Sequence, residues 1–254
     1  MLFDVTLFSD GSNIQRKPKG HLYLYPLIAI AAMLAIVFVM DLPHMHKPKQ
    51  QLSQTIRIPA GQRAQMDLPD GSVVWLNSQT TLTYDEDFGK KDRKVTLDGE
   101  AYFEVAHNKE IPFYVQTENI KVQVTGTKFD VCSYKGSNSF IARLIEGSIN
   151  LLTNNAKEEK PITSLTKGKY FSMENGKYKT GEMSSNNALA WMQGIYYFDD
   201  VPFKELLDKI ALYYNYKITV KNPKILENYR CTGKFKRFGR HRAYTKSYTK
   251  RPSV

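Results

Sequence analysis

The sequence predicts a mainly β protein with a single transmembrane helix, an all-β domain and a small, incomplete α+β unit. Three observations support this order. Residues 22–40 carry no charge, residues 55–180 alternate apolar and polar side chains between glycine turns, and residues 203–214 follow a helical repeat. We therefore expect six consecutive parts: a short cytoplasmic segment (1–20), a transmembrane helix (21–41), a linker (42–54), a β domain (55–182), a partial βαβ unit (183–236) and a basic disordered tail (237–254).

The apolar run from Leu22 to Met40 is long enough to cross a hydrocarbon layer of about 30 Å as a helix. No site of small residues follows it, which favours a retained anchor over a cleaved signal peptide. Arg16, Lys17 and Lys19 lie just before it, so the N-terminus is expected inside. The chain is thus predicted to be a single-pass protein of the inner, cytoplasmic membrane, with its bulk in the periplasm.

The β domain is predicted from short alternating runs that are separated by turn dipeptides. In residues 120–124 (IKVQV), the apolar side chains share one face and the polar ones share the other, so this strand is half buried. Asp98-Gly99 and Glu146-Gly147 are typical tight turns, because glycine adopts positive φ without strain. One side of the sheet should therefore face solvent.

The partial βαβ unit is predicted from a helical stripe between two short strands. Residues 194–198 (GIYYF) and 216–220 (YKITV) are the expected strands, and Pro202 suits the first turn of the helix. The apolar stripe consists of Phe203, Leu206, Leu207, Ile210, Ala211 and Tyr214. Such a unit buries too little apolar surface to be stable alone.

The net charge of +11 is concentrated at the C-terminus. Residues 236–254 contain seven basic residues and no acidic one, which leaves +4 for the rest of the chain. This tail has no apolar periodicity, so we expect it to be disordered. Because it is predicted to lie outside the cytoplasm, nucleic acid is not an expected partner.

The sequence contains no recognisable catalytic motif. The acidic candidates have simpler interpretations: a turn for Asp70, a charged loop for 85–87, and the solvent face of a strand for Glu100 and Glu104. We therefore predict no catalytic, cofactor-binding or metal site, and no enzyme. Cys132 and Cys231 are either free thiols or a single disulfide.

Four motifs in one order resemble FecR-type regulators. Residues 68–77 (LPDGSVVWLN) resemble LPDGSxVxLN, and residues 93–105 resemble R-x-V-x-L-x-G-E-A-Y-F-E-V. Residues 124–131 and 144–149 resemble VxGTxFxV and LxEGSV. The resemblance covers about 55–180, and the βαβ unit is similar to the small C-terminal domain of Bacteroidetes members, itself similar to the STN signalling domain.

This resemblance implies an anti-sigma regulator with a solenoid-like β domain. Its periplasmic part would contact the signalling domain of a TonB-dependent outer-membrane transducer, and a cytoplasmic helical domain would hold an ECF sigma factor. The chain departs from this plan at both ends, because residues 1–20 are shorter than a helical domain and the βαβ unit is incomplete. A truncated regulator is one interpretation.

Partner binding is predicted at exposed strand edges of the βαβ unit, where another strand can be added. The candidate residues are Ile195, Tyr196, Tyr197, Phe198, Tyr216, Ile218 and Val220. The alternative function is a cell-envelope carbohydrate-binding or carbohydrate-processing β protein that uses Trp75 and Tyr102 as stacking surfaces. Alternation equally allows both aromatic residues to lie in the core.

Overall fold

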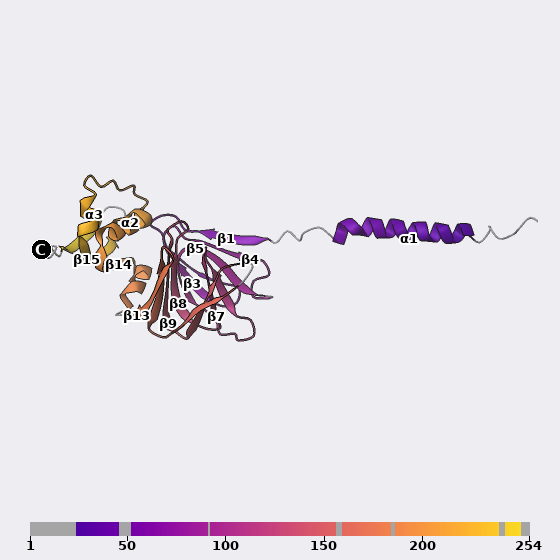
Figure 1. The fold of residues 1–254 in the computed structure, drawn as a ribbon, viewed down its shortest axis with the longest axis horizontal. Helices are drawn as coiled ribbons and strands as arrows, with labels where there is room; N and C mark the ends of the chain where they lie inside the picture. Colours follow the sequence, from indigo (N-terminus) through magenta and orange to yellow (C-terminus); the bar gives the residue numbers. More distant parts are fainter. Residues whose placement is uncertain are drawn as a thin grey trace, which may run out of the picture. The chain divides into compact units, whose positions relative to one another are not determined.

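The computed structural model describes residues 24–45, 52–90, 92–155, 159–183, 186–238 and 242–249 (Figure 1). The chain divides into two units, Met1–Gln50 and Gln51–Val254. Helix α1 (Leu24–Met45) is the described element of the first unit.

In the part of the chain that the structure describes, no helix is both long enough and apolar enough to cross a membrane. The predicted transmembrane helix at 21–41 is thus unsupported by the structure, and the predicted cytoplasmic segment 1–20 lies outside the described residues.

The β domain contains strands β1 to β13. Their bounds are β1 (Ser53–Arg57), β2 (Ala64–Asp67), β3 (Val73–Leu76), β4 (Thr81–Asp85), β5 (Arg93–Glu104), β6 (Phe113–Gln116), β7 (Ile120–Val124), β8 (Lys128–Ser133), β9 (Ser139–Glu146), β10 (Ser148–Thr153), β11 (Pro161–Thr166), β12 (Lys169–Glu174) and β13 (Lys177–Glu182). The prediction of a mainly β protein is confirmed.

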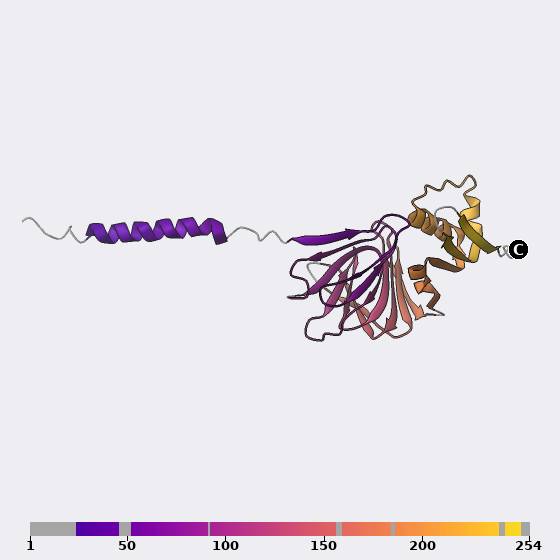
Figure 2. The same ribbon diagram turned by 180° about the vertical axis from the view of Figure 1, so that it is seen from behind.

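The long strand β5 joins two half-sheets, and the whole sheet folds over itself at this strand (Figures 1 and 2). Its first half pairs with β4 and β6, and its second half pairs with β3 and β8. The first half-sheet continues through β7, β10 and β11, and the second through β9, β12 and β13. Among the described strands only the β5–β6 pair is parallel. The solenoid-like expectation is wrong, because stacked solenoid coils require parallel pairing.

The apolar core lies between the two half-sheets. Phe103 on β5 stacks on Phe129 of β8 with ring centroids 5.1 Å apart, and Phe113 of β6 packs edge-on against Phe103. All three side chains are fully buried. Alternation along each strand therefore sends one set of side chains into this core and the other set to the outside.

A buried ion pair connects two of the family-like motifs. The Arg93 guanidinium lies 3.2 Å from the Asp70 carboxylate, and it also donates hydrogen bonds to the backbone carbonyls of Ile111 and Ala106 at 2.7 Å. Asp70 further accepts hydrogen bonds from the backbone and hydroxyl of Ser72. Asp70 therefore fixes the Pro69-Asp70-Gly71 turn, in agreement with its predicted structural role.

The C-terminal part, residues 186–249, combines helices with a second sheet. It contains the 3₁₀ helix η2 (Asn186–Gln193), β14 (Ile195–Pro202), α2 (Phe203–Tyr214), α3 (Lys224–Asn228), β15 (Arg230–Phe238) and β16 (Arg242–Thr249). The sheet order is β14-β15-β16, and both pairs are antiparallel. The predicted first strand and the predicted helix are confirmed.

Two predictions for the C-terminal part are wrong. Residues 216–220 form no strand. The position beside β14 that they were expected to occupy is taken by β15. The unit is therefore not a βαβ arrangement with parallel strands. The tail is not disordered at 242–249, because β16 pairs with β15 over eight residue pairs. Its two Tyr-Thr pairs are typical of a strand once that partner is present.

Candidate functional site

The outer face of the second half-sheet carries a row of polar and aromatic residues. Adjacent strands place these residues directly opposite one another, so their side chains are neighbours. In strand order, the row consists of Gln65, Trp75, Tyr102, Asp130, Arg143 and Tyr170.

A charged cluster lies in the middle of this row. The Arg143 Nη1 atom lies 2.6 Å from Asp130 Oδ2 and 4.0 Å from Glu100 Oε1. Asp130 is fully buried and Glu100 is only 4% exposed. The expectation that Glu100 faces solvent is wrong, because residues of the C-terminal part cover this face of the strand.

Three aromatic side chains of the C-terminal part reach the cluster. The Trp191 indole N–H donates to Asp130 Oδ1 at 3.2 Å, and the Tyr213 hydroxyl donates to Glu100 Oε2 at 3.2 Å. The third, Tyr196, donates its hydroxyl hydrogen to Asn77 Oδ1 at 3.2 Å. Since Asn77 in turn donates to Glu100 at 2.5 Å, the contacts form one connected network. We call Trp191, Tyr196 and Tyr213 the anchor residues.

Backbone contacts strengthen the same attachment. Arg63 Nη1 donates to the carbonyl of Trp191 at 2.6 Å, and Ser78 Oγ donates to the carbonyl of Tyr213 at 3.0 Å. The side-chain amide of Gln79 donates to the carbonyl of Leu212. Several hydrogen bonds therefore attach the C-terminal part to the β domain, and their directionality fixes how it is positioned there.

Burial sets the electrostatics of the cluster. It raises the pKa of Asp130 to about 7, although the Arg143 guanidinium opposes this shift and Glu100 adds to it. Burial also raises the pKa of Tyr213 well above its ordinary value, so its hydroxyl stays a hydrogen-bond donor. For Arg143, burial acts to lower the pKa, but Asp130 and Glu100 outweigh it and raise the pKa above its ordinary value.

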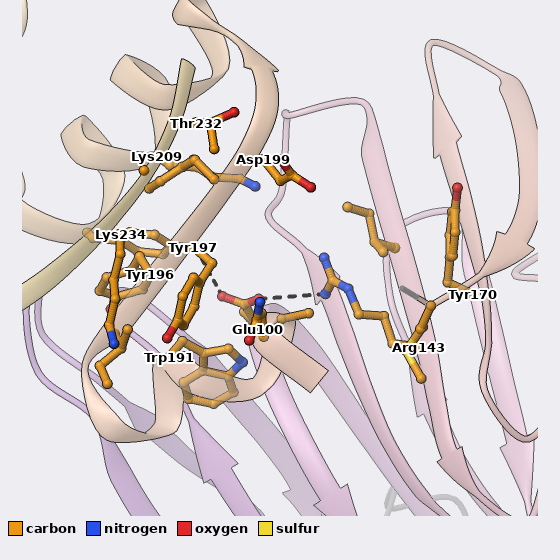
Figure 3. Close-up of a pocket in the computed structure, with 18 of the residues that line it drawn as sticks. Glu100, Arg143, Tyr170, Trp191, Tyr196, Tyr197, Asp199, Lys209, Thr232 and Lys234 are labelled. Carbon is orange, nitrogen blue, oxygen red and sulfur yellow. Dashed lines mark hydrogen bonds and ion pairs between the residues drawn. The ribbon is translucent and has the colours of Figure 1, made fainter. Parts of the chain in front are cut away.

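A pocket of about 970 Å³ opens beside the cluster (Figure 3). Arg143 and Tyr170 line it from the β domain, and Tyr197, Lys209 and Lys234 line it from the C-terminal part. Figure 3 shows the Arg143 side chain directed from the sheet toward Glu100 and the cavity. This volume is at the upper end of the range for ligand pockets in proteins.

Two family models match the chain in succession. The FecR protein model matches residues 54–150, and the FecR C-terminal model matches residues 195–240. The chain belongs to the FecR family. Residues 54–150 are hereafter called the FecR domain, and the pocket lies where its sheet meets the C-terminal part.

The chain is also similar to solved structures. Two crystal structures of a candidate anti-sigma factor from Parabacteroides distasonis match it, with TM-scores of 0.59 and 0.58 and identities of 27% and 26%. Each match covers 65% of this chain and 76% of the other. A search of curated proteins finds no match.

The structure divides the predicted partner-binding residues into two groups. Residues 195–198 line the pocket beside the FecR domain. Within this group, Tyr196 is an anchor residue and Phe198 is buried against Phe235, so Ile195 and Tyr197 are the members open to a ligand. The second group, Tyr216, Ile218 and Val220, lies outside the pocket in an irregular segment after α2.

Sequence reasoning missed the residues that attach the C-terminal part of this FecR-family chain. Asp130 and Arg143 are the charged residues in the interiors of two strands that follow each other in the chain, whose other charges lie at the strand ends. Opposite charges at such positions indicate a cross-strand pair. Trp191 has no comparable local signal, because its partner lies 61 residues away.

The remaining sequence predictions concern metal ligands, the two cysteines and two aromatic residues. Among the described residues, no group of three His, Cys, Asp or Glu side chains lies close enough to hold a metal ion. Both Cys132 and Cys231 are free thiols. Trp75 and Tyr102 contact each other outside the main core, with ring centroids 5.5 Å apart. Tyr102 is only 5% exposed, which disfavours a stacking platform for sugars.

Proposed function

We propose that this chain is a membrane-anchored regulator of a sigma factor, and that its extracytoplasmic part acts by binding a partner protein. In this proposal the FecR domain and the C-terminal part together receive a signal, and no covalent chemistry is involved. The finer proposal is that the signal comes from a TonB-dependent outer-membrane transducer and reaches an ECF sigma factor.

The attachment of the C-terminal part to the FecR domain is the observation that carries the proposal. Trp191 and Tyr213 donate hydrogen bonds to buried carboxylates of the FecR domain, and a pocket opens beside them. A joint made of directional polar contacts can be rearranged by a partner at lower cost than an apolar core. Similarity to anti-sigma factor structures supports the regulatory role.

The proposed membrane location rests on the sequence. Residues 22–40 carry no charge, and three basic residues lie just before them. Fractionation of cells that produce the full chain tests this location. We expect the protein in the inner-membrane fraction, with the FecR domain protected from protease until the outer membrane is opened; recovery in the soluble fraction would contradict it.

Transcript sequencing tests the regulatory role whichever sigma factor the chain controls. We compare cells that lack the gene, cells with the gene restored, and cells that overproduce the chain. We expect a small set of promoters with a common recognition element to change on deletion and to return with the restored gene. If transcription is the same in all three strains, the proposed function is wrong.

A further inference from the structure

The charged cluster on the outer face contains more carboxylates than cations. Asp130 and Glu100 lie 2.6 Å and 4.0 Å from the same guanidinium, that of Arg143. Asp130 is fully buried and Glu100 is nearly so. With both carboxylates ionised, the cluster would bury one uncompensated negative charge, which is unfavourable away from water. One bound proton makes the cluster neutral.

The groups around the two carboxylates do not remove this excess charge. Besides Arg143, the titratable groups that face Asp130 and Glu100 are Tyr102 of β5, Cys132 of β8, and Lys209 and Tyr213 of α2. The Lys209 ammonium is already paired with Glu205 at 2.9 Å. Burial raises the pKa of Tyr102 to about 12, and it also raises the pKa values of Cys132 and Tyr213, so these three groups stay neutral.

The C-terminal part supplies the cover that keeps water from the cluster. Trp191 of η2 donates to Asp130, and Tyr213 of α2 donates to Glu100, each at 3.2 Å. Both aromatic side chains are themselves buried. When the C-terminal part opens, water reaches the outer face of β8, and the neighbouring Arg143 then favours the ionised form of Asp130. Opening therefore releases the proton to solvent.

We propose that Glu100, Asp130 and Arg143 form a proton switch, which holds one proton while the C-terminal part is attached and loosens the attachment when that proton is lost. The pair of carboxylates beside one guanidinium, covered by Trp191 and Tyr213, is the arrangement that carries the inference. The inference concerns the attachment alone, so it does not depend on the proposed function.

The direction of the effect follows from the two states of Asp130. Burial raises its pKa to about 7 in the attached state, whereas an exposed aspartate has a pKa of about 4. Between these two values the attached state holds a proton that the opened state has lost. The attachment should thus be strongest at acidic pH, weaken as the pH rises to about 7, and change little above it.

Hydrogen exchange of the full-length chain in detergent tests this switch. Mass spectrometry follows peptides from residues 195–238 and from strands β5 and β8 at pH 5 and pH 8, with rates corrected for the intrinsic pH dependence of amide exchange. We expect the protection of residues 195–238 to fall at least about tenfold from pH 5 to pH 8, because each pH unit between the two pKa values can change the opening equilibrium by up to about tenfold. The FecR strands should exchange more slowly at both pH values.

An amide substitution identifies the group that binds the proton. Asp130→Asn removes the titrating carboxyl group but keeps an oxygen that can accept the hydrogen bond from Trp191. We expect this variant to lose the difference between pH 5 and pH 8 in residues 195–238. The control Asp92→Asn makes the same change at a side chain that is 49% exposed and should keep the difference. Circular dichroism of both variants should match that of the unmodified chain.

Three results would overturn the inference. These are equal protection of residues 195–238 at pH 5 and pH 8 in the unmodified chain, an unchanged pH difference in Asp130→Asn, and equal exchange in residues 195–238 and the FecR strands. The first and third results come from the unmodified chain, so they decide the matter even if the variant fails to fold. If promoter control persists while the attachment is independent of pH, the proposed function stands and only the proton switch is wrong.

Discussion

The FecR domain and the C-terminal part are stabilised in different ways. The FecR domain has a continuous apolar core that includes the stacked rings of Phe103 and Phe129. In the described residues of the C-terminal part, the buried apolar side chains are Trp191, Phe198, Leu206 and Tyr213. Trp191 and Tyr213 are also hydrogen-bonded to the FecR domain, so we expect the C-terminal part to be stabilised by this attachment.

This difference is consistent with the signal-receiving role proposed above. An apolar core resists small rearrangements, because moving one of its close-packed side chains disrupts the contacts of many neighbours. A joint held by hydrogen bonds between the two parts can open while the FecR domain stays folded. Variants that act on one region and spare the other therefore test the comparison.

The largest effect is expected from truncation in the FecR core. Phe129→Ala removes a fully buried ring and should lower the free energy of unfolding by about 3–5 kcal/mol. Urea unfolding followed by circular dichroism measures the loss. The control Phe198→Ala, in the C-terminal part, should leave the main transition of the FecR domain nearly unchanged. Equal losses in the two variants would show one shared cooperative core.

The next effect is expected at the attachment itself. Trp191→Phe removes the N–H donor to buried Asp130 and should weaken the attachment by about 1–3 kcal/mol. Hydrogen exchange should become faster in residues 195–238 and stay unchanged in strands of the FecR domain. Trp75→Phe is the matched control, because Trp75 lies in the same row of the outer face. Faster exchange throughout the chain in Trp191→Phe would contradict a separable attachment.

A pH dependence of the attachment follows from Asp130. Its pKa in the folded chain is raised to about 7 by burial, so between pH of about 4 and 7 the folded state holds a proton that the unfolded state has lost. The free energy of unfolding should therefore fall as pH rises through this window. Asp130→Asn should flatten this slope in urea titrations at pH 5 and pH 8. An unchanged slope in the variant would assign the dependence to other groups.

The smallest effect is expected on the surface of α2. Lys204 and Asp208 form an exposed ion pair at i,i+4 spacing, with a distance of 2.6 Å. Lys204→Ala should change stability by less than about 0.5 kcal/mol, since water screens such pairs. Differential scanning calorimetry should show a shift below about 2 °C. A larger shift would mean that α2 itself, and not its attachment, limits the stability of the C-terminal part.

Local patterns predicted the fold where partners lie close in the chain. Alternation identified strands such as 120–124, and the apolar stripe identified α2. Residues 216–220 have the same alternation, but no described strand pairs with them. Residues 242–249 have little apolar content, yet they form β16 because β15 supplies a full backbone ladder. In both segments, strand formation depends on whether another strand is available to pair with it, and amino-acid composition does not show this.

The candidate site was predictable only in part. The docking prediction at residues 195–198 coincides with a wall of the pocket. The opposite wall comes from Arg143 and Tyr170, which only strand register brings beside β14. Glu100 was expected in solvent because its own strand alternates, and the remote Tyr213 buries it. Burial caused by a distant segment leaves no local signal.

Replacement of the chromosomal gene by a Trp191→Ala allele tests whether the attachment has a regulatory role, with Trp75→Ala as the control allele. We expect Trp191→Ala to hold the regulated promoters at one level whatever the signal, while immunoblots show the chain present in normal amount. The control allele should keep the full response. A normal response in Trp191→Ala cells would contradict a regulatory role for the attachment of the C-terminal part to the FecR domain.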